Sequence, residues 1–277
     1  MTDKYAVLGN PIAHSKSPQI HQAFAKQTNQ DITYKAMLAP LDGFELTVRR
    51  LIDDGYKGVN VTVPFKLQAF LLSDHLSPFA QVARAANTLI LSRNNIQGHN
   101  TDGIGFIKDV TQNLNTKLQG ARILLLGAGG AAFGVLQSLL EANPSFVIIS
   151  NRTFAKADEA AKVLSGLIDA SNRKTVCMAV KLEDLGDMEF DLVINSTSTG
   201  LSDTALAIPD AIFAKNCLAY DMMYGRETSF MAQARAHGAQ VADGLGMLVE
   251  QAAEAFYLWR GVRPETAPVI ELLRSSN

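Results

Sequence analysis

Residues 122–132 read RILLLGAGGAA. The first five of these residues predict a buried strand, and the residues that follow continue in a helical pattern. Between the two lies the spacing G-x-G-x-x-A, in which Gly127 allows a tight turn, Gly129 lets a pyrophosphate approach the backbone, and Ala132 permits close packing of helix on strand. A tight turn alone would also explain the glycines. The strand before them and the helix N-terminus after them favour a dinucleotide-binding site instead.

Outward from this stretch, short apolar runs alternate with helical patterns in both directions, which is typical of βα units and a mostly parallel sheet. The expected strands are residues 5–8, 32–38, 58–63, 87–91 and a short one from Ile96, then 146–150, 175–180, 190–195 and 217–220. A helical pattern over residues 245–259 follows the last strand and is expected to return to the first domain. We therefore predict two α/β domains, one formed by residues 1–101 plus 245–277 and a Rossmann-type nucleotide-binding domain formed by residues 102–244.

Length and composition exclude several classes of protein. The 277 residues suggest two domains, and 47% hydrophobic with 19% charged residues indicates an ordinary globular chain. A net charge of −2 without a lysine or arginine run makes nucleic acid an improbable partner. No apolar run approaches the roughly 18 residues of a membrane span, so we expect a cytoplasmic protein with no membrane partner. The five histidines share no ligand spacing and the two cysteines are not paired in a motif, so we expect no metal site.

The end of the strand at 146–150 bears on which dinucleotide is bound. NAD enzymes carry an acidic residue there that binds the ribose 2′-hydroxyl, whereas this chain has Asn151-Arg152-Thr153. Arg152 offers a planar fork suited to a 2′-phosphate, with Lys156 one turn further on. The alternative is that Asn151 and Thr153 only cap the following helix while Arg152 is solvated. Because capping and phosphate binding are compatible, we favour NADP over NAD.

Polar residues follow the expected strands of the first domain. Ser15 and Ser17 lie on the loop after the first strand, where ligands gather in α/β sheets, and both could bind a carboxylate. The alternative is that Ser17 only caps the helix that begins with a proline. Asn60 and Thr62 share one face of a strand, and Lys66 follows them. Taken alone, a single lysine of this kind is usually a surface charge.

Six motifs then occur in one order along the chain: VTVPFK at 61–66, ANT at 86–88, NTDG at 100–103, GAGGAA at 127–132, NRT at 151–153 and DGLGMLVEQA at 243–252. In this order they resemble the shikimate dehydrogenase family, and the resemblance covers essentially the whole chain. One departure is Phe65, where many relatives have a histidine, while the neighbouring Lys66 is intact.

The resemblance implies two sets of site residues. For the substrate, Ser15 and Ser17 would bind the carboxylate, and the ring hydroxyls would contact Asn60, Thr62, Asn87, Asp102 and Gln251. Lys66 and Asp102 would form the catalytic pair, with Tyr224 approaching the substrate from the cofactor side. For the cofactor, the implied residues are Gly127, Ala128, Gly129, Gly130 and Ala131 on the pyrophosphate, Asn151, Arg152, Thr153, Phe154, Ala155 and Lys156 around the 2′-phosphate, and Met222 and Gly244 beside the nicotinamide.

The implied activity is the reversible NADPH-dependent reduction of 3-dehydroshikimate to shikimate in aromatic amino acid biosynthesis, with residues 1–101 plus 245–277 as the substrate-binding and catalytic domain. One alternative is a broader quinate/shikimate dehydrogenase that uses NAD, which the residues around Arg152 disfavour. A second is a catalytically silent NADPH-binding regulator, against which the intact Lys66 and Asp102 argue. The sequence allows a homodimer without predicting one.

Overall fold

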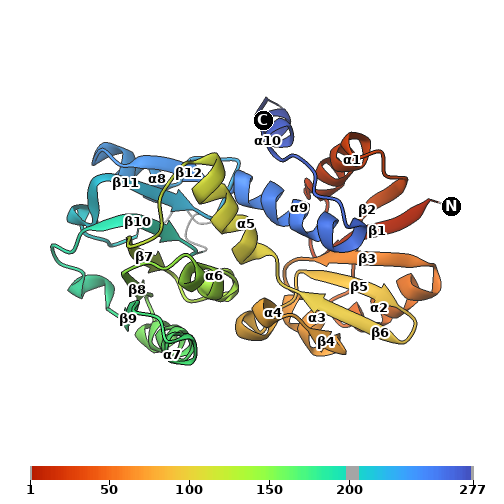
Figure 1. Cartoon of the computed structure of the whole chain (residues 1–277), viewed down its shortest axis with the longest axis horizontal. Helices are drawn as coiled ribbons and strands as arrows, with labels where there is room; N and C mark the ends of the chain where they lie inside the picture. Colours follow the sequence, from red (N-terminus) through yellow and green to blue (C-terminus); the bar gives the residue numbers. More distant parts are fainter. Residues whose placement is uncertain (1, 198–205, 276–277) are drawn as a thin grey trace. The chain divides into compact units, whose positions relative to one another are not determined.

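The computed structural model describes residues 2–197 and 206–275, and the chain divides into two compact α/β units, each with its own sheet (Figure 1). Unit 1 comprises Met1–Gly105 and Leu248–Asn277, and unit 2 comprises Phe106–Met247. The expected α/β fold with mostly parallel strands is confirmed.

The chain passes between the units within two helices, α5 (Asp102–Lys108) and α9 (Leu245–Arg260). The sequence analysis placed the boundaries after residues 101 and 244, whereas the structure places them after Gly105 and Met247. The reason is packing, because a Cβ added to Gly105 would lie 2.6 Å from the backbone nitrogen of Gln251. The first turn of α5 therefore rests on α9 and belongs to unit 1.

Unit 2 holds a six-stranded sheet in which every neighbouring pair is parallel. Its strands are β7 (Arg122–Leu126), β8 (Phe146–Ser150), β9 (Val176–Ala179), β10 (Phe190–Asn195), β11 (Phe213–Asp221) and β12 (Gln240–Asp243). The helices are α6 (Gly130–Glu141), α7 (Phe154–Ser171) and α8 (Ser229–Ala236), with a π-helical turn at Asp109–Asn113 and 3-10 turns at Leu182–Asp184 and Asp210–Ile212. The spatial order β12-β11-β10-β7-β8-β9 is the doubly wound order of a Rossmann domain, which reverses between β7 and β10.

The central strand of unit 2 shows why its sequence is apolar without alternation. Ile123 and Leu125 pack into one core cluster, whereas Leu124 and Leu126 pack into another, and all four are at most 1% exposed. Successive side chains of a strand point to opposite faces, and here both faces are covered. The run of leucines after Arg122 is therefore a direct consequence of a parallel sheet with two buried faces.

Unit 1 holds a mixed six-stranded sheet in the order β2-β1-β3-β5-β6-β4. Its strands are β1 (Asp3–Gly9), β2 (Ile32–Leu38), β3 (Tyr56–Val61), β4 (His75–Leu76), β5 (Thr88–Ser92) and β6 (Asn95–His99). The helices are α1 (Ser17–Gln27), α2 (Phe44–Asp53), α3 (Lys66–Leu72), α4 (Pro78–Ala83), α9 and α10 (Ala267–Ser275). Strand β5 runs antiparallel to β3 and β6. The two residues between Ser92 and Asn95 can join β5 to β6 only as antiparallel strands.

The C-terminal helix α9 packs onto the sheet of unit 1, as the sequence analysis predicted. Trp259 donates its indole N–H to the carbonyl of Leu89 on β5 at 3.0 Å, and its ring stacks on Tyr5 of β1 at 4.7 Å between centroids. Phe256 of the same helix packs edge to face with Phe24 of α1. The last helices of the chain thus complete the fold that begins with its first strand.

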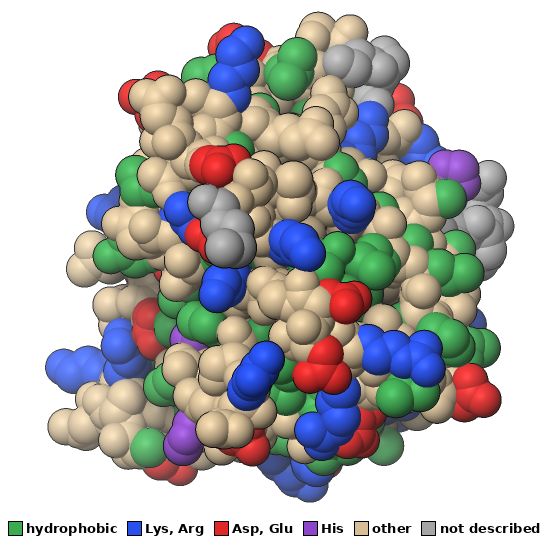
Figure 2. Space-filling model, turned by 90° about the vertical axis from the view of Figure 1, so that its right-hand side faces the viewer, with side chains coloured by type: hydrophobic (Ala, Val, Ile, Leu, Met, Phe, Trp, Pro, Cys, Tyr) green, Lys and Arg blue, Asp and Glu red, His purple; other side chains and the backbone are tan. Residues whose placement is uncertain are grey.

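One face of the molecule carries charges of both signs. The face drawn in Figure 2 intersperses lysine and arginine side chains with aspartate and glutamate side chains, in line with the net charge of −2. Within the described residues, no helix is both long enough and apolar enough to cross a membrane.

His21 of α1 is a fully buried histidine in the aromatic core of unit 1. Its ring stacks on Tyr34 with 4.2 Å between centroids and also packs near Trp259 and Phe256. Neither ring nitrogen has a hydrogen-bond partner in the part of the chain that the structure describes. Burial lowers the pKa of His21 to about 3, and the nearby Asn60 side chain opposes this only in part. The folded protein therefore holds a neutral imidazole.

This buried histidine predicts an acid-sensitive unit 1. Between the unfolded pKa near 6.5 and the folded pKa of about 3, only the unfolded chain binds a proton at His21. Stability then falls as the pH is lowered through this window, by about 1.4 kcal/mol per pH unit.

Replacing His21→Phe should remove this contribution to the slope of stability against pH. Urea unfolding at pH 4 to 7, followed by the fluorescence of the single tryptophan, Trp259, measures it. Phe24→Leu is the control, because it weakens the same cluster but keeps the titrating group, so its curve should be lower and equally steep. An unchanged slope in His21→Phe would contradict the assignment.

Candidate active site

The polar residues of unit 1 meet at one edge of its sheet. In the register of β3, β5 and β6, Asn60 pairs with Thr88 and Thr88 pairs with His99. The end of β3, the start of β5 and the end of β6 therefore lie side by side. The segments that hold Lys66 and Asp102 leave the sheet there, and the segment that holds Asn87 enters it there. Residues from three separate motifs are thus brought to one place by strand pairing.

Lys66 and Asp102 form an ion pair at this edge. Lys66 is the first residue of α3, Asp102 is the first residue of α5, and the Lys66 Nζ lies 2.6 Å from Asp102 Oδ2. The lysine side chain is 29% exposed and the aspartate side chain 10% exposed. A carboxylate that is mostly buried thus holds an ammonium group that still reaches solvent. Such a pair can bind an oxygen atom of a ligand and transfer a proton to it.

Asn87 holds the other oxygen of the carboxylate. Its Nδ2 donates to Asp102 Oδ1 at 2.8 Å and to Thr101 Oγ1 at 3.0 Å, while its Oδ1 accepts from the backbone N–H of Thr101 at 2.9 Å. Gln251 of α9 brings its Oε1 within 3.4 Å of both Asn87 Nδ2 and Thr101 Oγ1. Both amide hydrogens of Asn87 are therefore directed at protein oxygens. A direct contact with a ligand would require one of these bonds to be exchanged.

Asn60 is buried, and its side chain hydrogen-bonds three other residues. Its Nδ2 donates to the carbonyl of Asn87 at 3.3 Å and to Thr88 Oγ1 at 3.0 Å, and its Oδ1 accepts from the hydroxyl of Tyr34 at 2.6 Å. Burial raises the pKa of Tyr34 well above its usual value, with an opposing hydrogen bond from Ser17, so the phenol remains a donor. The Asn60 side chain also interacts with the ring of His21.

Ser15, Ser17 and Thr62 lie on the segments after β1 and β3. The interpretation that Ser17 caps α1 is wrong: Ser17 is the first residue of the helix, and Ser15 Oγ accepts its backbone N–H at 3.3 Å. Thr62 is half-buried just beyond β3, and its methyl group occupies the space left by Gly9, where an added Cβ would lie 2.6 Å away. These residues continue the same edge of the sheet.

The glycine-rich turn of unit 2 lies where the strand order reverses. Gly127 has a φ of +104°, and a Cβ there would lie 2.5 Å from Ser196 Oγ, which follows β10. Among the residues that the structure describes, no other atom lies within 4 Å of a Cβ added to Gly129 or Gly130, and both glycines are exposed together with Ala131. Gly127 is required by its positive φ and by the nearby Ser196, whereas Gly129 and Gly130 border open space. That space lies at the N-terminus of α6, where an anion is favoured.

The residues after β8 present an exposed cationic segment. The interpretation that Asn151 and Thr153 cap α7 is wrong, because Thr153 makes no capping hydrogen bond and Asn151 donates its amide to the carbonyl of Thr153 at 2.9 Å. The side chains of Arg152 and Lys156 form no ion pair or hydrogen bond within residues 2–197 and 206–275. The whole run of Arg152, Thr153, Phe154, Ala155 and Lys156 is exposed. Two cations are therefore available to a ligand.

Met222 and Gly244 meet at the ends of β11 and β12. A Cβ added to Gly244 would lie 2.3 Å from the carbonyl oxygen of Met222, so only glycine allows this approach. The loop that carries Met222 and Tyr224 is anchored by Asp221, which accepts hydrogen bonds from Asn195 Nδ2, Thr228 Oγ1 and the N–H of Met223. Tyr224 is half-buried, and burial raises its pKa.

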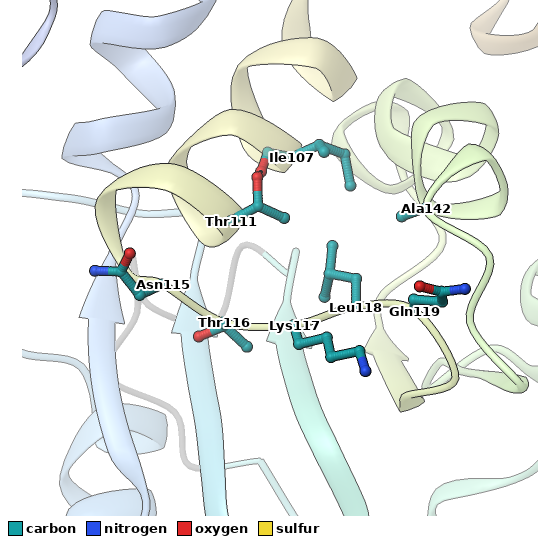
Figure 3. A pocket seen from close by; sticks show the side chains of 8 residues that line it. All are labelled: Ile107, Thr111, Asn115, Thr116, Lys117, Leu118, Gln119 and Ala142. Atoms are coloured by element: carbon teal, nitrogen blue, oxygen red, sulfur yellow. The ribbon is translucent and has the colours of Figure 1, made fainter.

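A hollow of about 440 Å³ on unit 2 lies outside this set of residues (Figure 3). It is lined by Ile107, Thr111, Asn115, Thr116, Lys117, Leu118, Gln119 and Ala142. The lining has one cation and no carboxylate or histidine, so it lacks the groups for proton transfer. Within the described ranges, no group of three or more histidine, cysteine, aspartate or glutamate side chains is arranged to hold a metal ion.

Family models match three segments of the chain. A shikimate dehydrogenase substrate binding domain matches residues 7–89, a shikimate/quinate 5-dehydrogenase model matches residues 109–202, and a shikimate 5′-dehydrogenase C-terminal domain matches residues 244–274. The chain belongs to the shikimate dehydrogenase family. The curated shikimate dehydrogenase (NADP(+)) of Methylobacillus flagellatus is 55% identical over 276 residues, covering 99% of this chain and 100% of the relative.

Solved structures of the shikimate dehydrogenase fold agree with both units. The crystal structure of an Ael1 enzyme from Pseudomonas putida is 45% identical with a TM-score of 0.90, covering 98% of each chain. Shikimate 5-dehydrogenase from Thermus thermophilus, in complex with NADP(H) and shikimate, is 32% identical with a TM-score of 0.87 over 100% of both chains. The fold of this chain is therefore one that holds both ligands in that relative.

The sequence analysis missed three members of the site: Tyr34, Thr88 and Thr101. Thr88 and Thr101 stand inside the motifs ANT and NTDG, but only their neighbours were given roles. Tyr34 belongs to no motif. What distinguishes it from the rest of β2 is its burial, at 4% exposed, which only the structure shows.

Proposed function

We propose that this chain catalyses the reversible NADPH-dependent reduction of the ketone of 3-dehydroshikimate to the hydroxyl of shikimate. The observation that carries the proposal is the ion pair between Lys66 and Asp102. The lysine is partly exposed, and Asn87 donates a hydrogen bond to the other oxygen of the carboxylate. The sequence similarity to NADP-dependent shikimate dehydrogenases over nearly the whole chain supports the choice of substrate.

Unit 1 would bind the substrate through hydroxyl and amide groups. Ser15 and Ser17 would donate to the carboxylate, and Asn60 would contact a ring hydroxyl. Thr62, Asn87, Asp102 and Gln251 would complete the contacts with the ring. Tyr224 of unit 2 would contact the substrate from the cofactor side.

Unit 2 would bind NADP. The residues fit the cofactor, because the positions of Gly129 and Gly130 border open space at a helix N-terminus, and Arg152 with Lys156 could bind the 2′-phosphate. Ala128 and Ala131 flank the same turn. Met222 and Gly244 would border the nicotinamide. When bound, the cofactor supplies the hydride.

The lysine would supply the proton. As the ketone carbon is reduced, negative charge develops on the ketone oxygen, and the Lys66 ammonium would stabilise that oxygen and donate a proton to it. Asp102 holds the ammonium in place. In the oxidation of shikimate, a neutral Lys66 would accept the proton from the hydroxyl.

The proposed reaction uses the reductant of biosynthesis, and we accordingly place the protein in the cytoplasm. It requires neither a nucleic acid nor a membrane partner, and a homodimer would be an addition to the site rather than a part of it. A quinate/shikimate dehydrogenase that uses NAD is disfavoured because no carboxylate stands at residues 151–153. A silent NADPH-binding regulator would not need the ion pair.

The first test measures oxidation of shikimate and of quinate, each with NADP and with NAD, by the absorbance of the reduced cofactor. We expect shikimate with NADP to give the highest kcat/KM of the four pairs. A higher value for quinate with NAD would identify the broader enzyme, and no turnover with any pair would identify the regulator.

The second test addresses the ion pair. Lys66→Ala should lower kcat by about 10² to 10⁴, with a smaller change in the KM for shikimate, because the lysine acts mainly on the transition state. Asp102→Asn should also lower kcat, and the double variant should be little worse than the poorer single variant, since the two groups act as a unit. Lys57→Ala, an exposed lysine on β3, is the matched control. Fully additive losses would mean independent roles.

The third test addresses the choice of cofactor. Losing a charge-assisted contact costs about 1.5 to 3 kcal/mol, so Arg152→Ala should raise the KM for NADP about tenfold or more and leave the KM for NAD nearly unchanged. Arg93→Ala in the exposed turn of unit 1 is the control for loss of an arginine. Equal losses with NADP and NAD would show that Arg152 does not bind the 2′-phosphate.

A further inference from the structure

Five hydrogen bonds in unit 1 form a chain that ends on the carboxylate of Asp102. Tyr34 donates to Asn60 Oδ1 at 2.6 Å, Asn60 Nδ2 donates to Thr88 Oγ1 at 3.0 Å, and Thr88 donates to Asn87 Oδ1 at 3.1 Å. Asn87 Nδ2 then donates to Asp102 Oδ1 at 2.8 Å, and Lys66 donates to the other carboxylate oxygen at 2.6 Å. The chain thus starts at Tyr34 on β2 and reaches the ion pair.

The direction of this chain is fixed at both ends. The Asp102 carboxylate only accepts and the backbone N–H of Thr101 only donates, so Asn87 must turn its Nδ2 to Asp102 and its Oδ1 to Thr101. Thr88 must then donate to that Oδ1, which leaves its oxygen to accept from Asn60. The backbone carbonyl of Asn87, which only accepts, also requires the Nδ2 of Asn60.

Burial makes every link of the chain necessary. Thr88 is 0% exposed, Asn87 3%, Tyr34 4% and Asn60 6%, so bulk water cannot readily replace a lost partner. A buried amide that loses one hydrogen-bond partner pays the full cost of desolvation, and it can also rotate to reverse its oxygen and nitrogen. Removal of one hydroxyl would therefore disturb the amides on either side of it.

We propose that Tyr34 and Thr88 are positioning residues of the active site, which fix the orientation of the Asn60 and Asn87 amides and through them the carboxylate of Asp102. Both would act through the residues they hydrogen-bond: Thr88 through Asn60 and Asn87, and Tyr34 through Asn60 and Ser17. This inference rests on the proposed function, since it concerns the same site. It deepens that proposal by assigning roles to residues outside the catalytic pair.

The two residues should have different kinetic signatures. Tyr34 hydrogen-bonds Asn60, which would bind a ring hydroxyl, and Ser17, which would bind the carboxylate, so its loss should act mainly on the KM for shikimate. Thr88 joins Asn60 to Asn87, and Asn87 holds Asp102, so its loss should raise KM and lower kcat together. Neither residue lies in unit 2, so NADP binding should be unchanged in both variants.

Thr88→Val removes the hydroxyl and keeps the shape of the side chain. We expect kcat/KM for shikimate to fall about tenfold to a hundredfold, with part of the loss in kcat, and Thr88→Ser to restore most of it. Thr33→Val, an exposed threonine on β2, is the matched control. The concentration of folded enzyme in each sample is measured by titration with NADPH, so a loss of folded protein does not count as a loss of kcat.

Tyr34→Phe removes the first donor of the chain and keeps the aromatic ring that stacks on His21. We expect a rise of about tenfold in the KM for shikimate with little change in kcat. Tyr56→Phe, a half-buried tyrosine on β3, is the control. Because both residues belong to one chain of hydrogen bonds, Tyr34→Phe combined with Thr88→Val should lose less than the product of the two single effects.

The outcomes separate this inference from the proposed function. If the wild-type protein fails to oxidise shikimate, the proposed function is wrong and the inference falls with it. If the wild-type enzyme is active and Thr88→Val keeps its kcat and KM per NADPH-binding site, the positioning role is wrong while the function stands. A loss that is equally large in Thr88→Ser would likewise overturn the role, because the hydroxyl alone would then not be sufficient to position the amides.

Discussion

A carboxylate that is 10% exposed needs a donor for each of its oxygens, and the substrate side of this protein is organised around that need at Asp102. Lys66 supplies one donor and Asn87 the other. Asn87 can serve only if its own amide oxygen is satisfied, which involves Thr88 and Thr101, and so the requirement spreads through the interior of unit 1. The ion pair that would perform the chemistry is thus the end point of a network that begins on an edge strand.

The two units meet their ligands by different physical means. Unit 1 presents side chains whose directions are set by buried hydrogen bonds, as its substrate would be a small polar ring with few features. Unit 2 presents backbone groups instead of side chains. Gly127 is required by its φ of +104° and by the close approach of Ser196, while Gly129 and Gly130 leave the backbone accessible to a ligand. A pyrophosphate is recognised by charge and by N–H groups, so glycine and a helix N-terminus are sufficient there.

Sequence reasoning succeeded where a pattern was local. The apolar run before Gly127 predicted a buried parallel strand, since both of its faces are covered in unit 2. Sequence reasoning failed where a strand was too short to show a pattern, or where a role depended on contacts between residues far apart in the chain. The two-residue strand β4 and the short β12 carry too few residues for a period to appear. The interpretations of Ser17 and Asn151 as caps were wrong because Ser17 is already the first residue of α1 and because Asn151 donates its amide N–H to the carbonyl of Thr153.

The sequence by itself determined the family, the two α/β domains and the identity of the residues in the motifs, because these depend on residue type and on spacing along the chain. Only the tertiary structure decided which of those residues touch. Lys66 and Asp102 are 36 residues apart, and their contact depends on the register that pairs β3 with β5 and β5 with β6. The roles of Tyr34 and Thr88 likewise depend on burial and on the direction of hydrogen bonds, which exist only once the strands have paired.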